Sequence, residues 1–129
     1  MKIHICTDVL GSPYAIYVTT ADATDRNGAI EMFSQPMLHL PNFVKILCDG
    51  GYTGEEFAAK IKTLTGAEVE IAKRPELHKF VVMPKRWIVE RTFGWLDKCR
   101  RLWKNCERLI ETTLNMVKLA LLSVLLRRY

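Results

Sequence analysis

Strand-like alternation of apolar and polar positions opens the chain. Residues 2–7 and 14–20 are rich in β-branched and aromatic side chains, and the Gly-Ser-Pro run at 11–13 predicts a turn between them. We therefore expect an antiparallel hairpin. Residues 44–48 are short and mostly apolar, which is typical of a strand buried on both faces. Residues 68–73 alternate aliphatic with charged side chains and predict a fourth strand.

Between these strands, apolar positions recur at helical spacing. We expect a first helix capped by Asp22 or Asp25 and ending before Pro36. A second helix is expected to start at a capping box formed by Thr53 and Glu56, and glycine is expected to end it. The order of strands and helices predicts an α/β fold with a mixed sheet flanked by helices, in one domain spanning residues 1–129.

The long helix expected over residues 84–104 divides into two faces. One face is an apolar stripe that predicts burial. The other is a charged stripe that comprises Arg86, Glu90, Asp97 and Arg101. Gly94 leaves a gap in the side-chain wall between the two carboxylates. Two interpretations stay open: a solvated face with ion pairs inside the helix, or a site for metal and phosphate.

A last helix is expected over residues 111–126. Its leucine-rich inner stripe predicts packing on the sheet, and the alternative is a helix-mediated oligomerisation module. No apolar run reaches the roughly 18 residues that a membrane span needs, and the N-terminus lacks a signal-peptide pattern. The four cysteines form no Cys-x-x-Cys pair, which favours reduced thiols and a cytoplasmic protein.

Charge is distributed unevenly along the 129 residues, whose net charge is +5. Up to Ala72 there are 5 Lys and Arg against 9 Asp and Glu, whereas from Lys73 onward there are 14 against 5. A basic second half of this kind indicates a polyanionic partner such as nucleic acid.

Two carboxylates are the candidates for chemistry. Asp49 follows a predicted buried strand and precedes two glycines, at the sheet edge where open α/β folds bind ligands. Glu90 lies within the basic helix. Together they suggest Mg²⁺, which prefers carboxylate oxygens and water. The alternatives are an ordinary strand-to-helix turn at Asp49 and an intrahelical ion pair at Glu90.

Longer motifs surround both carboxylates. The runs that carry this match are Asp-Gly-Gly-Tyr at 49–52, Lys-Arg-Pro at 73–75 and Trp-Ile-Val-Glu-Arg-Thr-Phe-Gly-Trp at 87–95. With them, essentially the whole chain resembles a bacterial insertion-sequence transposase of the Asp-Asp-Glu type, in the insertion-sequence-five group. The resemblance implies a ribonuclease-H-like fold that cuts and joins DNA with Mg²⁺ (or Mn²⁺).

Residue by residue, the resemblance makes Asp49 the second catalytic Asp and Glu90 the catalytic Glu, both of them metal ligands. Arg86 matches the family's basic residue before the Glu, and Lys98 is the nearest match to the one after it. Met83 stands where the family often has Tyr. The expected contacts with DNA phosphates are Lys85, Arg86, Arg91, Lys98, Arg100 and Arg101.

The first catalytic Asp of the family belongs to a strand that would precede residues 3–6. We therefore expect the chain to be the C-terminal portion of a catalytic domain that lacks its first strand, with Asp8 in a structural or supporting role. The unpaired edge of residues 2–7 predicts a homodimer or association with an N-terminal transposase fragment. The alternative function is a non-catalytic DNA-binding or inhibitory remnant. Either form would be cytoplasmic, and nucleoid-associated when bound to DNA.

Overall fold

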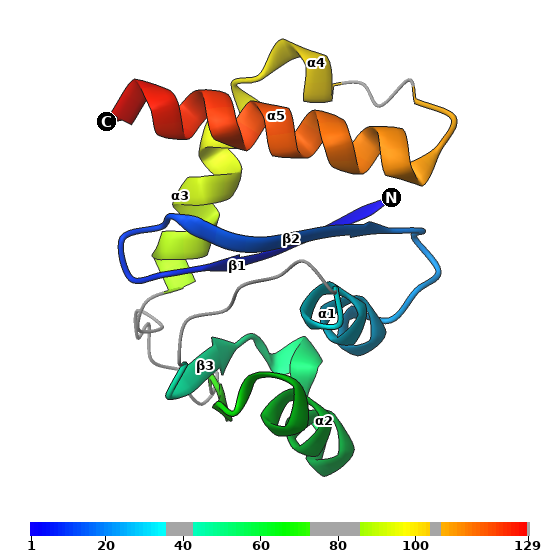
Figure 1. Cartoon of the computed structure of the whole chain (residues 1–129), viewed down its shortest axis with the longest axis vertical. Coiled ribbons are helices and arrows are strands. Elements are labelled where there is room, and N and C mark those ends of the chain that lie inside the picture. Colours follow the sequence, from blue (N-terminus) through cyan, green and yellow to red (C-terminus); the bar gives the residue numbers. More distant parts are fainter. Residues whose placement is uncertain (36–42, 73–85, 104–106, 129) are drawn as a thin grey trace, which may run out of the picture.

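The computed structural model describes residues 1–35, 43–72, 86–103 and 107–128 (Figure 1). Its elements in chain order are β1 (Lys2–Thr7), β2 (Pro13–Thr19), α1 (Asp25–Phe33), β3 (Lys45–Cys48), the 3₁₀ turn η1 (Gly50–Tyr52), α2 (Glu55–Thr65), β4 (Glu68–Ile71), α3 (Arg86–Asp97), α4 (Arg100–Trp103) and α5 (Ile110–Arg128). The mixed α/β class is confirmed. Within the described ranges, no helix is both long and apolar enough to span a bilayer.

The N-terminal hairpin is confirmed. β1 and β2 pair antiparallel from Lys2 opposite Thr19 to Cys6 opposite Ala15, and the register shifts between Cys6 and Thr7. The turn between the strands is closed by Asp8, whose Oδ1 accepts hydrogen bonds from two backbone N–H groups of residues 10 and 12, at 2.9 and 2.8 Å. Gly11 has a φ of 84°, in the left-handed region that glycine adopts without strain.

The strands do not form one sheet in the described part of the chain. β1 pairs with β2 in one ladder, and β3 pairs with β4 in a second, parallel ladder. The expected burial of β3 on both faces is wrong. Ile46 and Cys48 pack on the core, whereas Leu47 on the other face is 40% exposed. A strand with only one covered face alternates in burial because successive side chains point to opposite sides.

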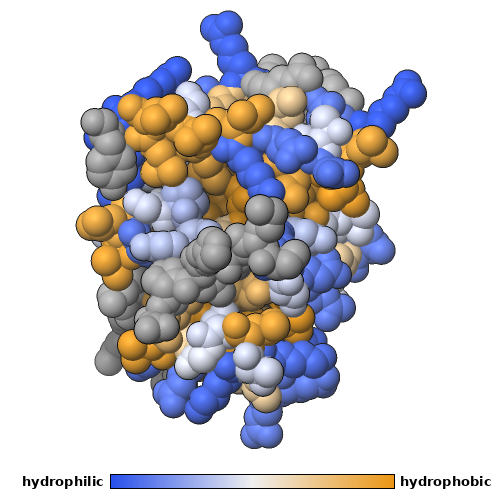
Figure 2. Space-filling view, in the orientation of Figure 1, coloured by the Kyte–Doolittle hydropathy of each residue, from blue (hydrophilic) through white to orange (hydrophobic). Residues whose placement is uncertain are grey.

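The hairpin lies between two hydrophobic clusters because alternate side chains of β2 point to opposite faces. On one face, Ile16 and Val18 pack against Leu96 of α3 and against Val117 and Leu121 of α5. The expectation that the last helix packs on the sheet is therefore confirmed, and Figure 1 shows α5 lying along β2. The outer face of α5 also carries apolar side chains (Figure 2), and its exposed leucines are Leu119, Leu122 and Leu126.

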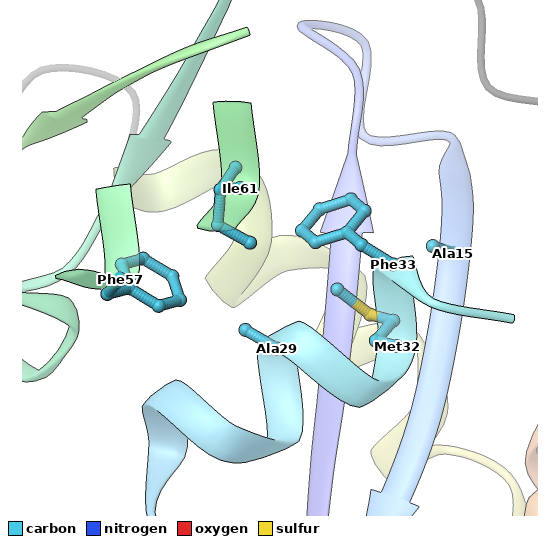
Figure 3. Close-up of a cluster of buried hydrophobic side chains, with 6 residues drawn as sticks. All are labelled: Ala15, Ala29, Met32, Phe33, Phe57 and Ile61. Carbon is cyan, nitrogen blue, oxygen red and sulfur yellow. The ribbon is translucent and has the colours of Figure 1, made fainter. Parts of the chain in front are cut away.

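The second cluster lies on the other face of the hairpin. Ala15 of β2 meets Met32 and Phe33 of α1, and Phe57 and Ile61 of α2 complete the cluster. Figure 3 shows these side chains converging between the two helices and the hairpin. This cluster joins the β3–β4 unit to the hairpin, since side chains of both ladders pack on it.

Helix starts differ from the sequence-based expectation. The N-cap of α1 is Thr24, whose hydroxyl accepts a hydrogen bond from Asn27 N at 3.2 Å, rather than Asp22 or Asp25. The N-cap of α2 is Gly54, with no side-chain capping bond, so the capping box at Thr53 is wrong. The glycine stop is confirmed, because Gly66 ends α2 in the left-handed conformation. Several adjacent polar residues can each act as an N-cap, and the local backbone angles decide which one does. The sequence does not show these angles.

The long helix expected over residues 84–104 is interrupted. α3 ends at Asp97, and a tight turn follows in which Cys99 N donates to Leu96 O at 2.9 Å. α4 then carries Leu102 onto the same cluster as Leu96. Six residues apart, the two leucines would lie about 120° apart around a continuous helix, and the break allows both to contact the same cluster. The expected helix start at residue 84 lies within residues 73–85, outside the described ranges, as do the Lys-Arg-Pro run and Met83.

Candidate active site

Asp49 lies at the turn that follows β3. Its side chain is exposed, its backbone is extended, and its carbonyl accepts a hydrogen bond from Tyr52 N at 3.1 Å. Because β3 runs parallel to β4, Asp49 stands at the carboxyl edge of this pair. That edge is where open α/β sheets bind ligands, and the sequence predicted this position correctly.

The turn after β3 packs against the start of α1. Arg26 donates from Nη1 to Thr53 O at 3.2 Å, and a Cβ added to Gly51 would lie 3.2 Å from Asp25 Oδ2. Asp25 in turn pairs with Lys2 Nζ at 3.3 Å. An acidic residue that the sequence indicated only as a helix cap therefore lies close to the turn that Asp49 begins.

The pKa of Tyr52 is affected by its burial in this turn and by the charges around it. Burial raises the pKa of Tyr52 to about 12, and the nearby carboxylates of Asp25 and Asp49 add to the effect. A phenol with so high a pKa stays neutral at physiological pH. Tyr52 therefore contributes a hydroxyl and an aromatic face, packed beside Phe57, rather than a charge.

Glu90 lies in the first half of α3 with its side chain exposed. The helix is anchored to the hairpin turn by the two residues that follow Glu90. Thr92, which is fully buried, donates from Oγ1 to Gly11 O at 3.0 Å. Arg91 donates from Nη2 to Leu10 O at 2.6 Å. Glu90 is thus presented outward from a helix that is fixed in position.

Arg91 has a packing role that sequence reasoning missed. Its guanidinium lies 4.8 Å from the ring centroid of Trp87 and 5.1 Å from that of Trp95. Its buried Nε has no hydrogen-bond partner among the described residues. A signal was present in the sequence, because Trp87, Arg91 and Trp95 follow one another at four-residue spacing and share a helix face. Its expected contact with DNA stays a prediction.

The predicted site residues fall into separate groups. Asp8 shapes the hairpin turn on which α3 docks, and a supporting role for it at the site stays a prediction. No hydrogen bond or ion pair between described residues joins Asp49 to Glu90. The described ranges also hold no group of three or more His, Cys, Asp or Glu side chains that could bind a metal. Lys85 and the side chains of Arg86 and Arg101 lie outside the described part.

The cysteines do not add a metal site to the described structure. Cys6, Cys48 and Cys99 are unpaired thiols. Burial raises the pKa of Cys6 to about 11 and that of Cys48 to about 12. Thiols with such high pKa values are protonated at neutral pH and are poor nucleophiles and ligands.

Comparison with known proteins gives the family. The profile of the Transposase DDE domain family matches residues 1–125. The chain belongs to this family of insertion-sequence transposases. It is also 34% identical over 116 residues to a putative transposase for insertion sequence element IS402 from Burkholderia cepacia. That alignment covers 83% of this chain and 54% of the relative, so the chain spans about half the length of the curated transposase it matches. No solved structure matches significantly.

The carboxylates of this transposase domain fit a hard divalent cation in donor type. Mg²⁺ is usually bound through one or two carboxylates together with water and substrate phosphates. Two carboxylates from one chain therefore match the usual number and type of protein ligands. Asp49 and Glu90 are both exposed and therefore accessible to such an ion. Their assignment as a pair stays a prediction.

Proposed function

We propose that this chain is part of the catalytic domain of a DNA transposase that hydrolyses phosphodiester bonds and transfers DNA strands in a complete assembly. The observation that carries the proposal is the family match over residues 1–125, which includes both candidate carboxylates. The placement of Asp49 at the carboxyl edge of β3 supports it, as does the exposure of Glu90 on an anchored helix. The basic second half of the chain fits a DNA substrate.

In this proposal Asp49 and Glu90 hold Mg²⁺ (or Mn²⁺). Such an ion, when bound, activates water and stabilises the leaving oxygen of a phosphodiester. Thr92 and Arg91 keep α3 docked on the hairpin turn, which fixes the direction in which Glu90 points. The cations around α3 and α4 hold the DNA backbone in register, since phosphate contacts position a protein on DNA.

A nicking assay tests the catalytic assignment. Supercoiled plasmid carrying insertion-sequence ends is incubated with the chain and Mg²⁺ or Mn²⁺, alone and with the remaining part of an IS402-like transposase. We expect Asp49→Asn and Glu90→Gln to lower the nicking rate at least a hundredfold. Asp97→Asn is the matched control, because Asp97 is an exposed carboxylate on the same helix. Unchanged nicking by Glu90→Gln would show that the assignment is wrong.

A second candidate function is a non-catalytic DNA-binding or inhibitory form of the transposase. It requires only the basic second half of the chain, and the described residues hold no group of three or more His, Cys, Asp or Glu side chains that could bind a metal. This form would bind DNA with strong salt dependence in EDTA, would not nick it under any of the conditions above, and would slow nicking by an intact transposase.

We also propose that the strand edges of β1 and β3 receive a strand from a partner polypeptide. In the described residues each strand is paired on one side only, β1 with β2 and β3 with β4. Cys6 and Cys48 come from these two strands and pack on the same cluster, so the strands lie near each other. Unpaired edges invite strand addition. Light scattering on the chain alone and on its mixture with an N-terminal transposase fragment tests this. We expect a homodimer in the first sample or a heteromer in the second, and a monomeric chain in both samples would contradict the proposal.

A further inference from the structure

A hollow lies where the end of α3, the start of α4 and the last turns of α5 meet. Its volume is about 490 Å³. The residues that line it are Trp95, Lys98, Cys99, Arg100, Ser123, Val124, Arg127 and Arg128. This volume lies within the range of about 300–1,000 Å³ over which protein pockets hold ligands. The hollow therefore has room for a ligand larger than a single ion.

The charge of the hollow has one sign. Four of its eight lining residues are cations and none is acidic. The ion pairs among the described residues, Lys2–Asp25, Lys45–Glu70 and Lys60–Glu56, all lie elsewhere. Cations gathered without carboxylates repel one another and are stabilised by a bound anion.

One wall of the hollow is held in place. Arg128 stacks on the Trp95 ring at 4.5 Å from the centroid, and Arg91 lies 5.1 Å from the same ring. Stacking of this kind restricts Arg128 and so leaves less side-chain entropy to lose when an anion binds. Lys98, Arg100 and Arg127 are exposed and come from three different segments.

We propose that this hollow binds the phosphodiester backbone of DNA, at a place distinct from Asp49 and Glu90. Cations placed on three segments around a hollow suit a chain of phosphates, and the hydroxyl of Ser123 is a neutral donor of the kind found at phosphate oxygens. The proposal rests on the proposed function in taking DNA as the ligand. It goes beyond it by bringing in the C-terminal end of α5, which carries Arg127 and Arg128.

The test compares two double variants of the full chain. Arg100→Gln with Arg127→Gln removes two charges from the hollow. Arg108→Gln with Lys118→Gln removes two exposed charges elsewhere, and Lys118 is nine residues from Arg127 and so on the opposite side of α5. Binding of a labelled short duplex is followed by fluorescence anisotropy in EDTA, at about 50 to 200 mM salt. Thermal melts confirm that both variants are folded.

We expect the hollow variant to bind duplex about tenfold or more weakly, with the slope of log K against log salt reduced by about 2, because each phosphate contact contributes about 0.9. The control variant should retain most of the affinity and slope. Equal losses in both variants, or no duplex binding by the unaltered chain, would overturn the proposal. Another outcome would also overturn it. In that outcome the unaltered chain binds inorganic phosphate saturably, as measured by tryptophan fluorescence, but the hollow variant binds DNA with unchanged affinity.

The failure of this proposal is distinguishable from failure of the proposed function. The assay contains EDTA and so does not depend on a metal held by Asp49 and Glu90. Absence of metal-dependent nicking by the unaltered chain, with this pattern of DNA binding intact, would count against the catalytic assignment alone.

Discussion

The contact between α3 and the hairpin turn rests on one buried hydroxyl, and its removal gives a sharp prediction. Thr92 is fully buried, and its Oγ1 lies 3.0 Å from Gly11 O and 3.2 Å from Ile88 O. Ile88 O also accepts the helical hydrogen bond from the backbone of residue 92, so it keeps a partner when the hydroxyl is lost. The change Thr92→Val therefore affects chiefly the Gly11 carbonyl.

The magnitude follows from that carbonyl. A buried acceptor left without its donor costs about 1–3 kcal/mol. Valine keeps the shape of the side chain, so no large cavity term is added. We expect Thr92→Val to lower the free energy of unfolding by about 2 kcal/mol, a large fraction of the roughly 5–15 kcal/mol of a typical domain.

Urea unfolding followed by tryptophan fluorescence measures this loss. The matched control is Thr63→Val on α2, because the hydroxyl of Thr63 donates to Ala59 O, at 3.0 Å, in an exposed position. We expect this control to change the free energy of unfolding by less than about 0.5 kcal/mol. If Thr92→Val costs no more than Thr63→Val, the hydroxyl does not anchor α3 and the account of how Glu90 is positioned is refuted.

Three further predictions concern packing and pH. A Cβ on Gly28 would meet the His4 ring at 2.3 to 2.8 Å, so Gly28→Ala should lower the free energy of unfolding by about 1–3 kcal/mol, and wild-type stability in urea would contradict this packing. A Cβ on Gly94 meets no described atom within 4 Å, so Gly94→Ala should raise the free energy of unfolding by about 0.5–1 kcal/mol, and a loss of stability in a thermal melt would contradict it. Burial lowers the pKa of His4 below its ordinary value of 6.5, so the unfolded chain binds this proton more readily than the folded chain. The contribution of His4 to stability is present above pH 6.5 and is lost as the pH falls through the lowered pKa, by at most about 1.4 kcal/mol per pH unit. His4→Gln should remove this part of the pH dependence of urea unfolding, and an unchanged slope between pH 5.5 and 7.5, about one unit either side of the ordinary pKa, would contradict it.

Local chemistry made several elements predictable. The hairpin follows from alternating side chains on both sides of a Gly-Pro turn, and it was placed to within one residue. The end of α2 follows from Gly66, since glycine adopts the left-handed conformation without a Cβ clash. Asp49 was correctly placed at a strand end because a short apolar run followed by two glycines has few other interpretations.

Other features depended on contacts between distant segments. Residue spacing within α3 does not reveal that Arg91 reaches Leu10 O in the hairpin turn. The break after Asp97 is explained by the packing of Leu96 and Leu102 on one cluster, which residue spacing alone does not show. The lining of the basic hollow joins residues of α5 to the end of α3, which lie more than twenty residues apart in the sequence.

By itself, then, the sequence determined the class of fold and the family, because these depend on local periodicity and on motifs of adjacent residues, while the metal-binding role of Asp49 and Glu90 stays a prediction. Only the tertiary structure decided that α3 is anchored at Thr92, that the described strands pair in two separate ladders, and that four cations surround one hollow. The physical reason is that burial and charge proximity depend on distances through space, which residue spacing fixes within one element but not between elements.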